Sequence, residues 1–150
     1  MTNPSVEQLQ SWKNEIAILR KIRHERILLF MGACTKHARL ALVTALCENG
    51  SLYHQIHNLK TPYSIFSIVQ LADQIAQGMA YLHARGLLHR DLKSKNILLN
   101  EKMEVKIADF GLSCMKRDHA VQSGLMGSVY WMGPELFRGK QNSEKSDVYA

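Results

Sequence analysis

Residues 89–96 read HRDLKSKN and residues 109–111 read DFG, and together they hold two acidic side chains, an amide and several cations. Phosphoryl transfer needs little covalent help from a protein. It needs a carboxylate that orients the attacking hydroxyl and accepts its proton, oxygen ligands for Mg²⁺, and positive charge near the phosphate. Asp91 can supply the first, Asn96 and Asp109 the second, and Lys93 the third.

The pattern around these segments predicts helices and short strands in an α+β fold. Helical spacing of apolar residues and short apolar runs predict elements over residues 5–23 (helix), 27–30 and 40–44 (strands), 65–85 (helix), and 97–99 with 105–107 (a hairpin). Glu15 lies beside the apolar stripe of the first helix, where a carboxylate normally has a cationic partner. Residues 109–135 show no sustained period and are predicted to be a long loop, which in compact domains is usually functional.

Three motifs resemble those of protein kinases. Residues 89–96 resemble the catalytic loop H-R-D-L-K-x-x-N, and residues 109–111 resemble the metal-binding D-F-G. Residues 131–135, WMGPE, resemble W-M-A-P-E, with Gly133 where alanine is usual. Three ordered motifs are far more specific than one. The resemblance implies a protein-kinase-like fold, mainly the helical C-lobe with helix C and part of the N-lobe sheet, and ATP and Mg²⁺ as cofactors.

The resemblance assigns roles to single residues. Asp91 matches the catalytic base, Lys93 and Asn96 are further catalytic residues, and Asn96 and Asp109 match the metal ligands. Other positions match the nucleotide site. Glu15 matches the helix-C glutamate and Thr44 the gatekeeper, and the adenine ring would contact Ala45 and Cys47 of the hinge and Leu98 below it. Four apolar or aromatic positions match the regulatory spine, although ordinary core packing explains them equally well: Leu19, Phe30, His89 and Phe110. Asp147 matches the helix-F aspartate that anchors the catalytic loop.

Other stretches indicate a subfamily. Lys93, two residues after Asp91, favours a serine/threonine kinase, since tyrosine kinases usually carry Ala or Arg there. Similarity to the Raf branch of the tyrosine-kinase-like group extends over residues 20–24, 28–32, 51–53, 91–96 and 127–132. This resemblance implies a MAP kinase kinase as protein substrate and a side-to-side dimer through the end of helix C. Arg23 occupies the matching position, and is equally plausible as a solvated cation at a helix end.

Residues 112–130 correspond to the activation loop of the family. Ser113, Ser123 and Ser128 are candidate phosphorylation sites, because a phosphate there could order the loop by pairing with Arg90. Ser128 has a second interpretation, as part of the turn that docks the substrate.

Two parts of a kinase domain are missing from this sequence. It contains no G-x-G-x-x-G glycine loop, and no V-A-I-K strand precedes the helix with Glu15. Lys13 cannot replace the strand lysine, because it lies two positions before Glu15 on the same helix and points elsewhere. We therefore expect residues 1–150 to be a partial kinase domain, from helix C to the start of helix F, truncated at both ends and without the late C-lobe helices. The isolated chain should bind ATP–Mg²⁺ poorly and be weakly active or inactive.

Composition argues against several other classes. No apolar run approaches the ~18 residues of a membrane span, so no transmembrane segment is expected. Three cysteines without disulfide or metal spacing favour a reducing, cytoplasmic setting: Cys34, Cys47 and Cys114. The net charge of +6 is spread over small groups of cations, so nucleic acid is not expected as a partner.

Two alternative functions stay open. The first is a non-catalytic interaction module, a pseudokinase-like or truncated form that docks onto a Raf-like kinase. The second is a small-molecule phosphotransferase, which shares the same Asp–Asn–Asp logic. The peptide-docking segment that ends at residues 131–135 argues against the second.

Overall fold

The computed structural model describes residues 6–34, 40–115 and 127–150. The elements follow in this order: α1 (Val6–Leu19), β1 (Phe30–Cys34), β2 (Ala41–Thr44), a π-helical turn (His54–Asn58), α2 (Ile65–Ala84), β3 (Leu87–Leu88), a 3₁₀ turn (Ser94–Asn96), β4 (Ile97–Leu99), β5 (Val105–Ile107), β6 (Cys114–Met115), a second 3₁₀ turn (Val129–Trp131), α3 (Pro134–Phe137) and α4 (Glu144–Tyr149). The described strands form three antiparallel pairs, β1–β2, β3–β6 and β4–β5. Helices with small sheets confirm the predicted α+β fold.

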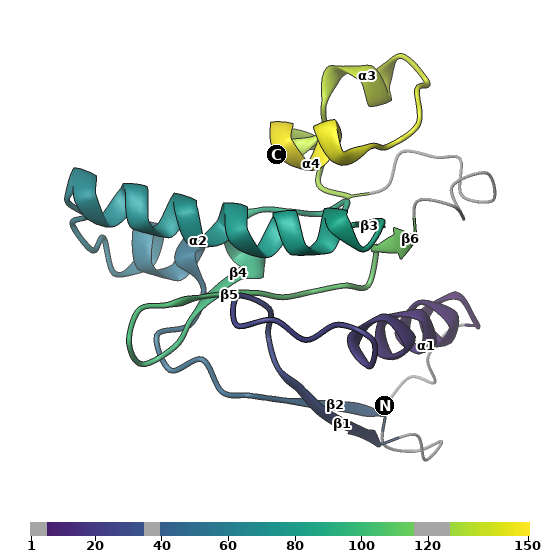
Figure 1. Ribbon diagram of the computed structural model, residues 1–150, viewed down its shortest axis with the longest axis horizontal. Coiled ribbons are helices and arrows are strands. Elements are labelled where there is room, and N and C mark those ends of the chain that lie inside the picture. Colours follow the sequence, from purple (N-terminus) through teal and green to yellow (C-terminus); the bar gives the residue numbers. More distant parts are fainter. Residues whose placement is uncertain (1–5, 35–39, 116–126) are drawn as a thin grey trace.

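Helix α2 runs through the middle of the molecule (Figure 1). It begins where Ser64 accepts a hydrogen bond from the backbone N–H of Ser67 at 3.1 Å, which is an N-cap. It ends just before Gly86, whose φ of 67° lies in the left-handed region that terminates helices. The predicted helix over 65–85 is confirmed. One stripe of this helix is buried: Leu71, Gly78, Met79 and Leu82.

The β4–β5 hairpin packs against α2 and forms the centre of the core. The hairpin itself was predicted. In the structure Ile97 pairs with Ile107 and Leu99 with Val105, and each of the four is at most 2% exposed. Gly78 of α2 is close to this hairpin, since a Cβ there would lie 2.6 Å from Cδ1 of Ile107. The missing side chain therefore lets the helix and the hairpin approach closely.

The N-terminal part differs from its prediction in two places. Helix α1 ends at Leu19 instead of residue 23, and β1 begins at Phe30 instead of residue 27. Ile27 forms an isolated bridge with Ile107, and the N–H of Leu28 donates to the carbonyl of Ile107 at 2.9 Å. The apolar run at 27–29 therefore attaches to β5 before the chain pairs with β2.

Short elements occupy the predicted loop over 109–135. Leu88 of β3 pairs with Cys114 of β6, a 3₁₀ turn covers residues 129–131, and α3 begins at Pro134. Pieces of two to four residues carry no periodicity that a sequence pattern can show. The prediction of an irregular segment here was therefore correct only in outline.

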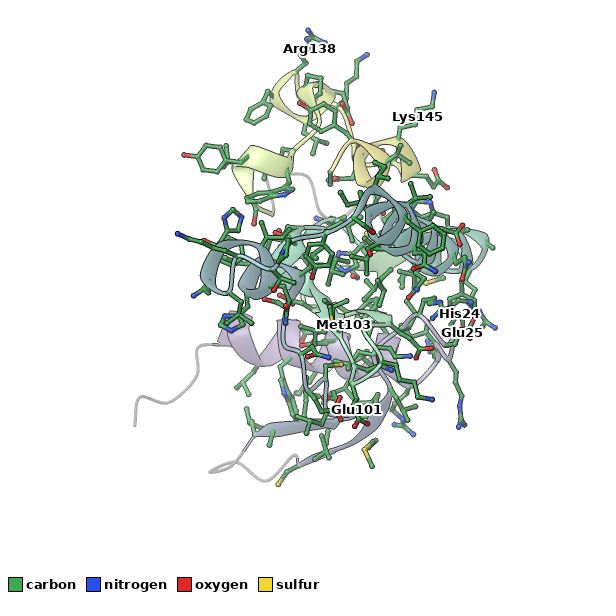
Figure 2. All side chains as sticks on the ribbon, turned by 90° about the vertical axis from the view of Figure 1, so that its left-hand side faces the viewer. His24, Glu25, Glu101, Met103, Arg138 and Lys145 are labelled. Carbon is green, nitrogen blue, oxygen red and sulfur yellow. The ribbon has the colours of Figure 1, made fainter. Side chains whose placement is uncertain are left out.

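The elements are arranged in three tiers. In Figure 1, α1 with β1 and β2 lies at one end, α3 with α4 at the other, and α2 with the remaining strands between them. The view in Figure 2 shows Arg138 and Lys145 projecting at the α3–α4 end, far from Glu101 in the β4–β5 turn. Within the described ranges, no helix is long and apolar enough to cross a membrane.

Candidate active site

The Asp91 carboxylate is held by three donors. Its Oδ2 accepts from Lys93 Nζ at 2.5 Å and from Asn96 Nδ2 at 3.2 Å, and its Oδ1 accepts from the N–H of Ser128 at 2.9 Å. Lys93 Nζ also donates to Ser128 Oγ at 2.7 Å. A carboxylate offers about four acceptor positions. The three donors therefore leave room on Oδ1 for one more, such as a hydroxyl.

These contacts also set the charge of Asp91. Burial alone would raise the pKa of this carboxyl group. Hydrogen bonds from Lys93 and Ser128, together with the charge of Lys93, outweigh burial and hold the pKa of Asp91 below its usual value. Asp91 is therefore ionised at neutral pH, as a group that accepts a proton must be.

Gly127 allows the last part of the segment 112–130 to reach the catalytic loop. Its φ of 111° is rarely adopted by other residues, and a Cβ would lie 2.6 Å from the carbonyl oxygen of Arg90. This close approach brings the N–H of Ser128 to Asp91. The contacts of Ser128 favour its second interpretation, as part of the substrate-docking turn.

The other two candidate phosphorylation sites are Ser113 and Ser123. Ser113 is buried, and its hydroxyl donates to the carbonyl of His89 at 3.1 Å. A modifying kinase could not reach this hydroxyl without opening the core, so the prediction of Ser113 as an accessible phosphosite is not supported by its burial. Ser123 lies outside the described residues.

The β4–β5 hairpin brings together the predicted metal ligands. Asn96 directly precedes β4, Asp109 closely follows β5, and the N–H of Ala108 donates to the Asn96 carbonyl at 2.9 Å. The described side-chain hydrogen bonds of Asn96 come from Nδ2, so its Oδ1 stays available to a cation. One amide oxygen and one carboxylate fit Mg²⁺, which completes its shell with water and phosphate and would stabilise phosphate charge.

Glu15 of α1 lies close to Asp109. Burial raises the pKa of Glu15 and the charge of Asp109 raises it further, while a hydrogen bond from the backbone N–H of Phe110 acts in the opposite direction. Among the described ion pairs, none joins Glu15 to a lysine or arginine. A cation between these two carboxylates would relieve their repulsion. This is the place that the resemblance gives to a lysine and the ATP phosphates.

Asp147 of α4 anchors the catalytic loop. Its Oδ2 accepts from the N–H of His89 at 2.9 Å and its Oδ1 from the N–H of Arg90 at 2.8 Å. Nε2 of His83 lies 2.9 Å from Oδ2. Arg90 has a φ of 71°, a conformation that costs about 1–3 kcal/mol for a residue other than glycine. The two hydrogen bonds that Asp147 accepts hold the loop in this strained shape.

His89 connects the loop to the core. Its side chain is fully buried, Nε2 lies 3.1 Å from the carbonyl oxygen of Ala108, and its ring centroid lies 5.3 Å from that of Phe110. Burial lowers the pKa of His89, opposed by the charges of Asp147, Asp109 and Asp91. The neutral ring therefore donates to Ala108. The remaining residues predicted for the spine belong to or pack against the same core: Leu19, Phe30 and Phe110.

The predicted adenine residues follow β2 or lie on β4. Thr44 ends β2, Ala45 and Cys47 follow it, and Leu98 joins this segment through a bridge to Ser51. The described backbone hydrogen bonds use neither the carbonyl of Ala45 nor the N–H of Cys47. An acceptor and a donor of this kind suit the edge of an adenine ring. The nucleotide-binding role of these residues stays a prediction.

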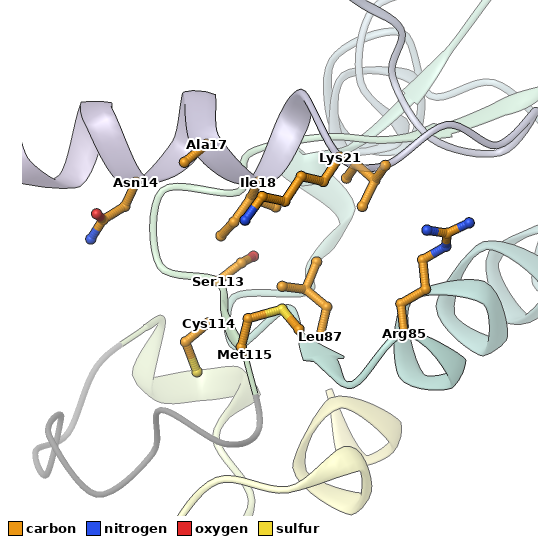
Figure 3. Close-up of a pocket in the computed structure, with 10 residues that line it drawn as sticks. Asn14, Ala17, Ile18, Lys21, Arg85, Leu87, Ser113, Cys114 and Met115 are labelled. Atoms are coloured by element: carbon orange, nitrogen blue, oxygen red, sulfur yellow. The ribbon is translucent and has the colours of Figure 1, made fainter.

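A separate cavity of about 370 Å³ lies between α1 and the β3–β6 pair (Figure 3). Residues from α1 and the turn after it, from the C-cap of α2, from β3, and from β6 with the residue before it line the cavity: Asn14, Ala17, Ile18, Lys21, Ile22, Arg85, Leu87, Ser113, Cys114 and Met115. Neither Asp91 nor Asp109 contributes to its walls. The cavity is therefore distinct from the candidate active site.

A carboxylate held by a lysine, together with an amide and a second carboxylate of the kind that Mg²⁺ prefers, is the set of groups expected in a protein kinase site. Residues 1–150 match the family of protein tyrosine and serine/threonine kinases, and the chain belongs to this family. Its whole length is 49% identical, over 157 aligned positions, to the RAF proto-oncogene serine/threonine-protein kinase of Xenopus laevis. The chain spans 24% of that relative. The Raf-like resemblance is confirmed.

Proposed function

We propose that this chain carries the catalytic residues of a serine/threonine kinase that transfers the γ-phosphate of ATP, with Mg²⁺, to a protein hydroxyl. The ionised Asp91 carboxylate, with one acceptor position left for a hydroxyl, supports this most directly. Asp91 orients the hydroxyl and takes its proton, and Lys93 fixes Asp91 while placing positive charge beside the acceptor. Asn96 and Asp109 hold the cation.

In this proposal residues 1–150 are part of a longer kinase domain. The close approach of Glu15 and Asp109 supports it, since a strand lysine from outside this sequence would neutralise them. Apolar side chains at the start of α2 support it as well, because exposed patches of this kind are normally covered: Ile65 (77% exposed), Phe66 (68%), Ile68 (49%) and Val69 (58%). The later helices of the domain are the proposed cover.

Phosphate transfer is the direct test. The isolated chain and a longer protein that includes it are incubated with radiolabelled ATP, Mg²⁺ and a MAP kinase kinase. We expect labelled serine or threonine from the longer protein, and a rate at least about 100-fold lower from the isolated chain, which has no glycine loop or strand lysine to hold the phosphates. No transfer by the longer protein would instead favour the non-catalytic interaction module.

The proposed substrate, pathway and location depend on the similarity of the chain to the RAF kinase of Xenopus laevis. A MAP kinase kinase is the proposed protein substrate and the MAP kinase cascade the proposed pathway, because the chain is so similar to a RAF kinase. A cytoplasmic location is proposed for the same reason. The free thiols of the described cysteines agree with a reducing compartment.

A dimer contact at Arg23 is also proposed, with a second kinase domain of the same type as partner. Arg23 is exposed, and its backbone is fixed by a hydrogen bond from its N–H to Tyr81 Oη at 2.8 Å. Leu29 and Met31, a few residues further along, are 46% and 67% exposed. Leu29 lines the same pocket as Arg23, and a fixed arginine beside an exposed apolar side chain is typical of the centre of an interface.

We expect Arg23→His in the longer protein to weaken self-association about tenfold or more, measured by sedimentation equilibrium. Lys145→His is the matched control, because Lys145 projects from the α3–α4 end (Figure 2). Sedimentation that is unchanged by Arg23→His would contradict the contact, and would leave Arg23 as a solvated cation at the end of a helix.

A further inference from the structure

Lys95 is held over an aromatic ring beside the candidate active site. Its Nζ lies 4.8 Å from the centroid of the Tyr53 ring, within the range of a cation–π contact. The Tyr53 ring in turn lies 4.4 Å from the ring of His57. Lys95 is exposed, and the contact with Tyr53 restricts where its ammonium group lies.

The position of Lys95 relative to Asp91 is set by the backbone. Lys95 belongs to the 3₁₀ turn Ser94–Asn96, and the side chain of Asn96 bonds both the carbonyl and the carboxylate of Asp91. The segment with Tyr53 is joined to the strand that follows this turn, because the N–H of Leu99 donates to the carbonyl of Gly50 at 2.8 Å. Lys95 and Tyr53 are therefore parts of the same rigid frame as the catalytic base.

The two lysines of this loop, Lys93 and Lys95, differ in the groups that their ammonium groups contact. Lys93 is bound to Asp91 and Ser128. Lys95 forms none of the ion pairs found among the described residues. The ring of Tyr53 covers one side of its ammonium group, and the remaining N–H donors are left for a partner outside the chain.

We propose that Lys95 selects protein substrates with an aspartate or glutamate close to the acceptor hydroxyl, since Lys95 lies in the same loop as Asp91 and directly before Asn96, which bonds Asp91. The inference rests on the proposed phosphoryl transfer at Asp91, which fixes where the acceptor lies. A substrate carboxylate would pair with Lys95, whereas a lysine or arginine at the same place would be repelled. A lysine that only stabilises the turn through Tyr53 would show no such preference.

The test uses three fluorescent serine peptides that differ only in the residues flanking the serine, which are aspartate, alanine or lysine. Their dissociation constants for the 150-residue chain are measured by fluorescence anisotropy at two salt concentrations. We expect the wild-type chain to bind the aspartate peptide about tenfold more tightly than the lysine peptide, less so at high salt. Lys95→Glu should reverse this order, and Lys95→Ala should leave only the weak preference that comes from the net charge of the chain.

Lys102→Glu is the matched control, since the chain carries a net charge of +6 and would attract acidic peptides weakly by that alone. Lys102 lies between Glu101 and Met103, labelled in Figure 2, at the far end of the hairpin from Asn96. Lys102→Glu makes the same change in net charge as Lys95→Glu, and should leave the order of the three peptide affinities as in the wild type. The proposal is wrong if Lys95→Glu and Lys102→Glu act equally, or if neither alters the order.

Phosphate transfer to the same peptides, measured in the longer protein, separates the two proposals. A preference that depends on Lys95 in binding, without any transfer of phosphate, would overturn the kinase activity and support the acidic-peptide site. Transfer that is equally fast for all three peptides would overturn the acidic-peptide site and support the kinase activity.

Discussion

Replacing Asp91 with asparagine is expected to lower phosphate transfer about 10²–10⁴-fold, the usual contribution of a general base. Asparagine has nearly the same shape, but its amide cannot take a proton at neutral pH. The NH₂ group of the asparagine would also face a hydrogen-bond donor, either Lys93 or the N–H of Ser128, from which the carboxylate now accepts. The measurement is kcat and KM of the longer protein with ATP and a serine substrate, together with the affinity for ATP–Mg²⁺.

The loss should appear in kcat, because the proposed ligands Asn96 and Asp109 are unchanged and nucleotide affinity should stay within about threefold. Asp73→Asn is the control for the same chemical change on an exposed part of α2, where Asp73 accepts only from Gln77 at 2.7 Å among the described contacts. Full activity in the Asp91 variant would remove Asp91 from the mechanism. The chain would then be better explained as an interaction module.

Much of this site could be predicted because its chemistry is encoded locally. Asp91, Lys93 and Asn96 lie within one short loop, and the β4–β5 hairpin that carries the chain on to Asp109 has a clear pattern of apolar residues. A pattern of this kind predicts a hairpin without knowledge of the rest of the fold. The hairpin then brings the chain back beside Asn96, because the N–H of Ala108 donates to the Asn96 carbonyl.

The contacts that hold the loop in shape could not be predicted in this way. Ser128 reaches Asp91 across 37 residues, and His83 reaches Asp147 across 64. Both depend on how distant segments pack, and no period along the sequence records that. The sequence does hold one local signal for the first contact, because Gly127 has no side chain where the backbone of Arg90 comes close. The shift of β1 has the same origin, since Ile27 bonds to β5 only in the packed structure.

Asp147→Ala is expected to lower the free energy of unfolding of the chain by about 2–5 kcal/mol. The change removes the acceptors for the backbone N–H groups of His89 and Arg90, which belong to buried residues. Each buried donor without a partner costs about 1–3 kcal/mol, and a domain of this size has only about 5–15 kcal/mol in total. Urea denaturation followed by circular dichroism measures the loss as a lower midpoint with little change in slope.

Two further variants identify which contact of Asp147 matters. Asp147→Asn keeps one acceptor oxygen but turns an NH₂ group toward the other backbone N–H, so its loss should lie between the wild type and Asp147→Ala. His83→Ala removes only the bond at the partly exposed edge and should cost less than either. If His83→Ala were as harmful as Asp147→Ala, the imidazole and not the two amides would hold the loop. In that case the hydrogen bonds from the N–H groups of His89 and Arg90 to Asp147 would not explain how Arg90 keeps its strained φ.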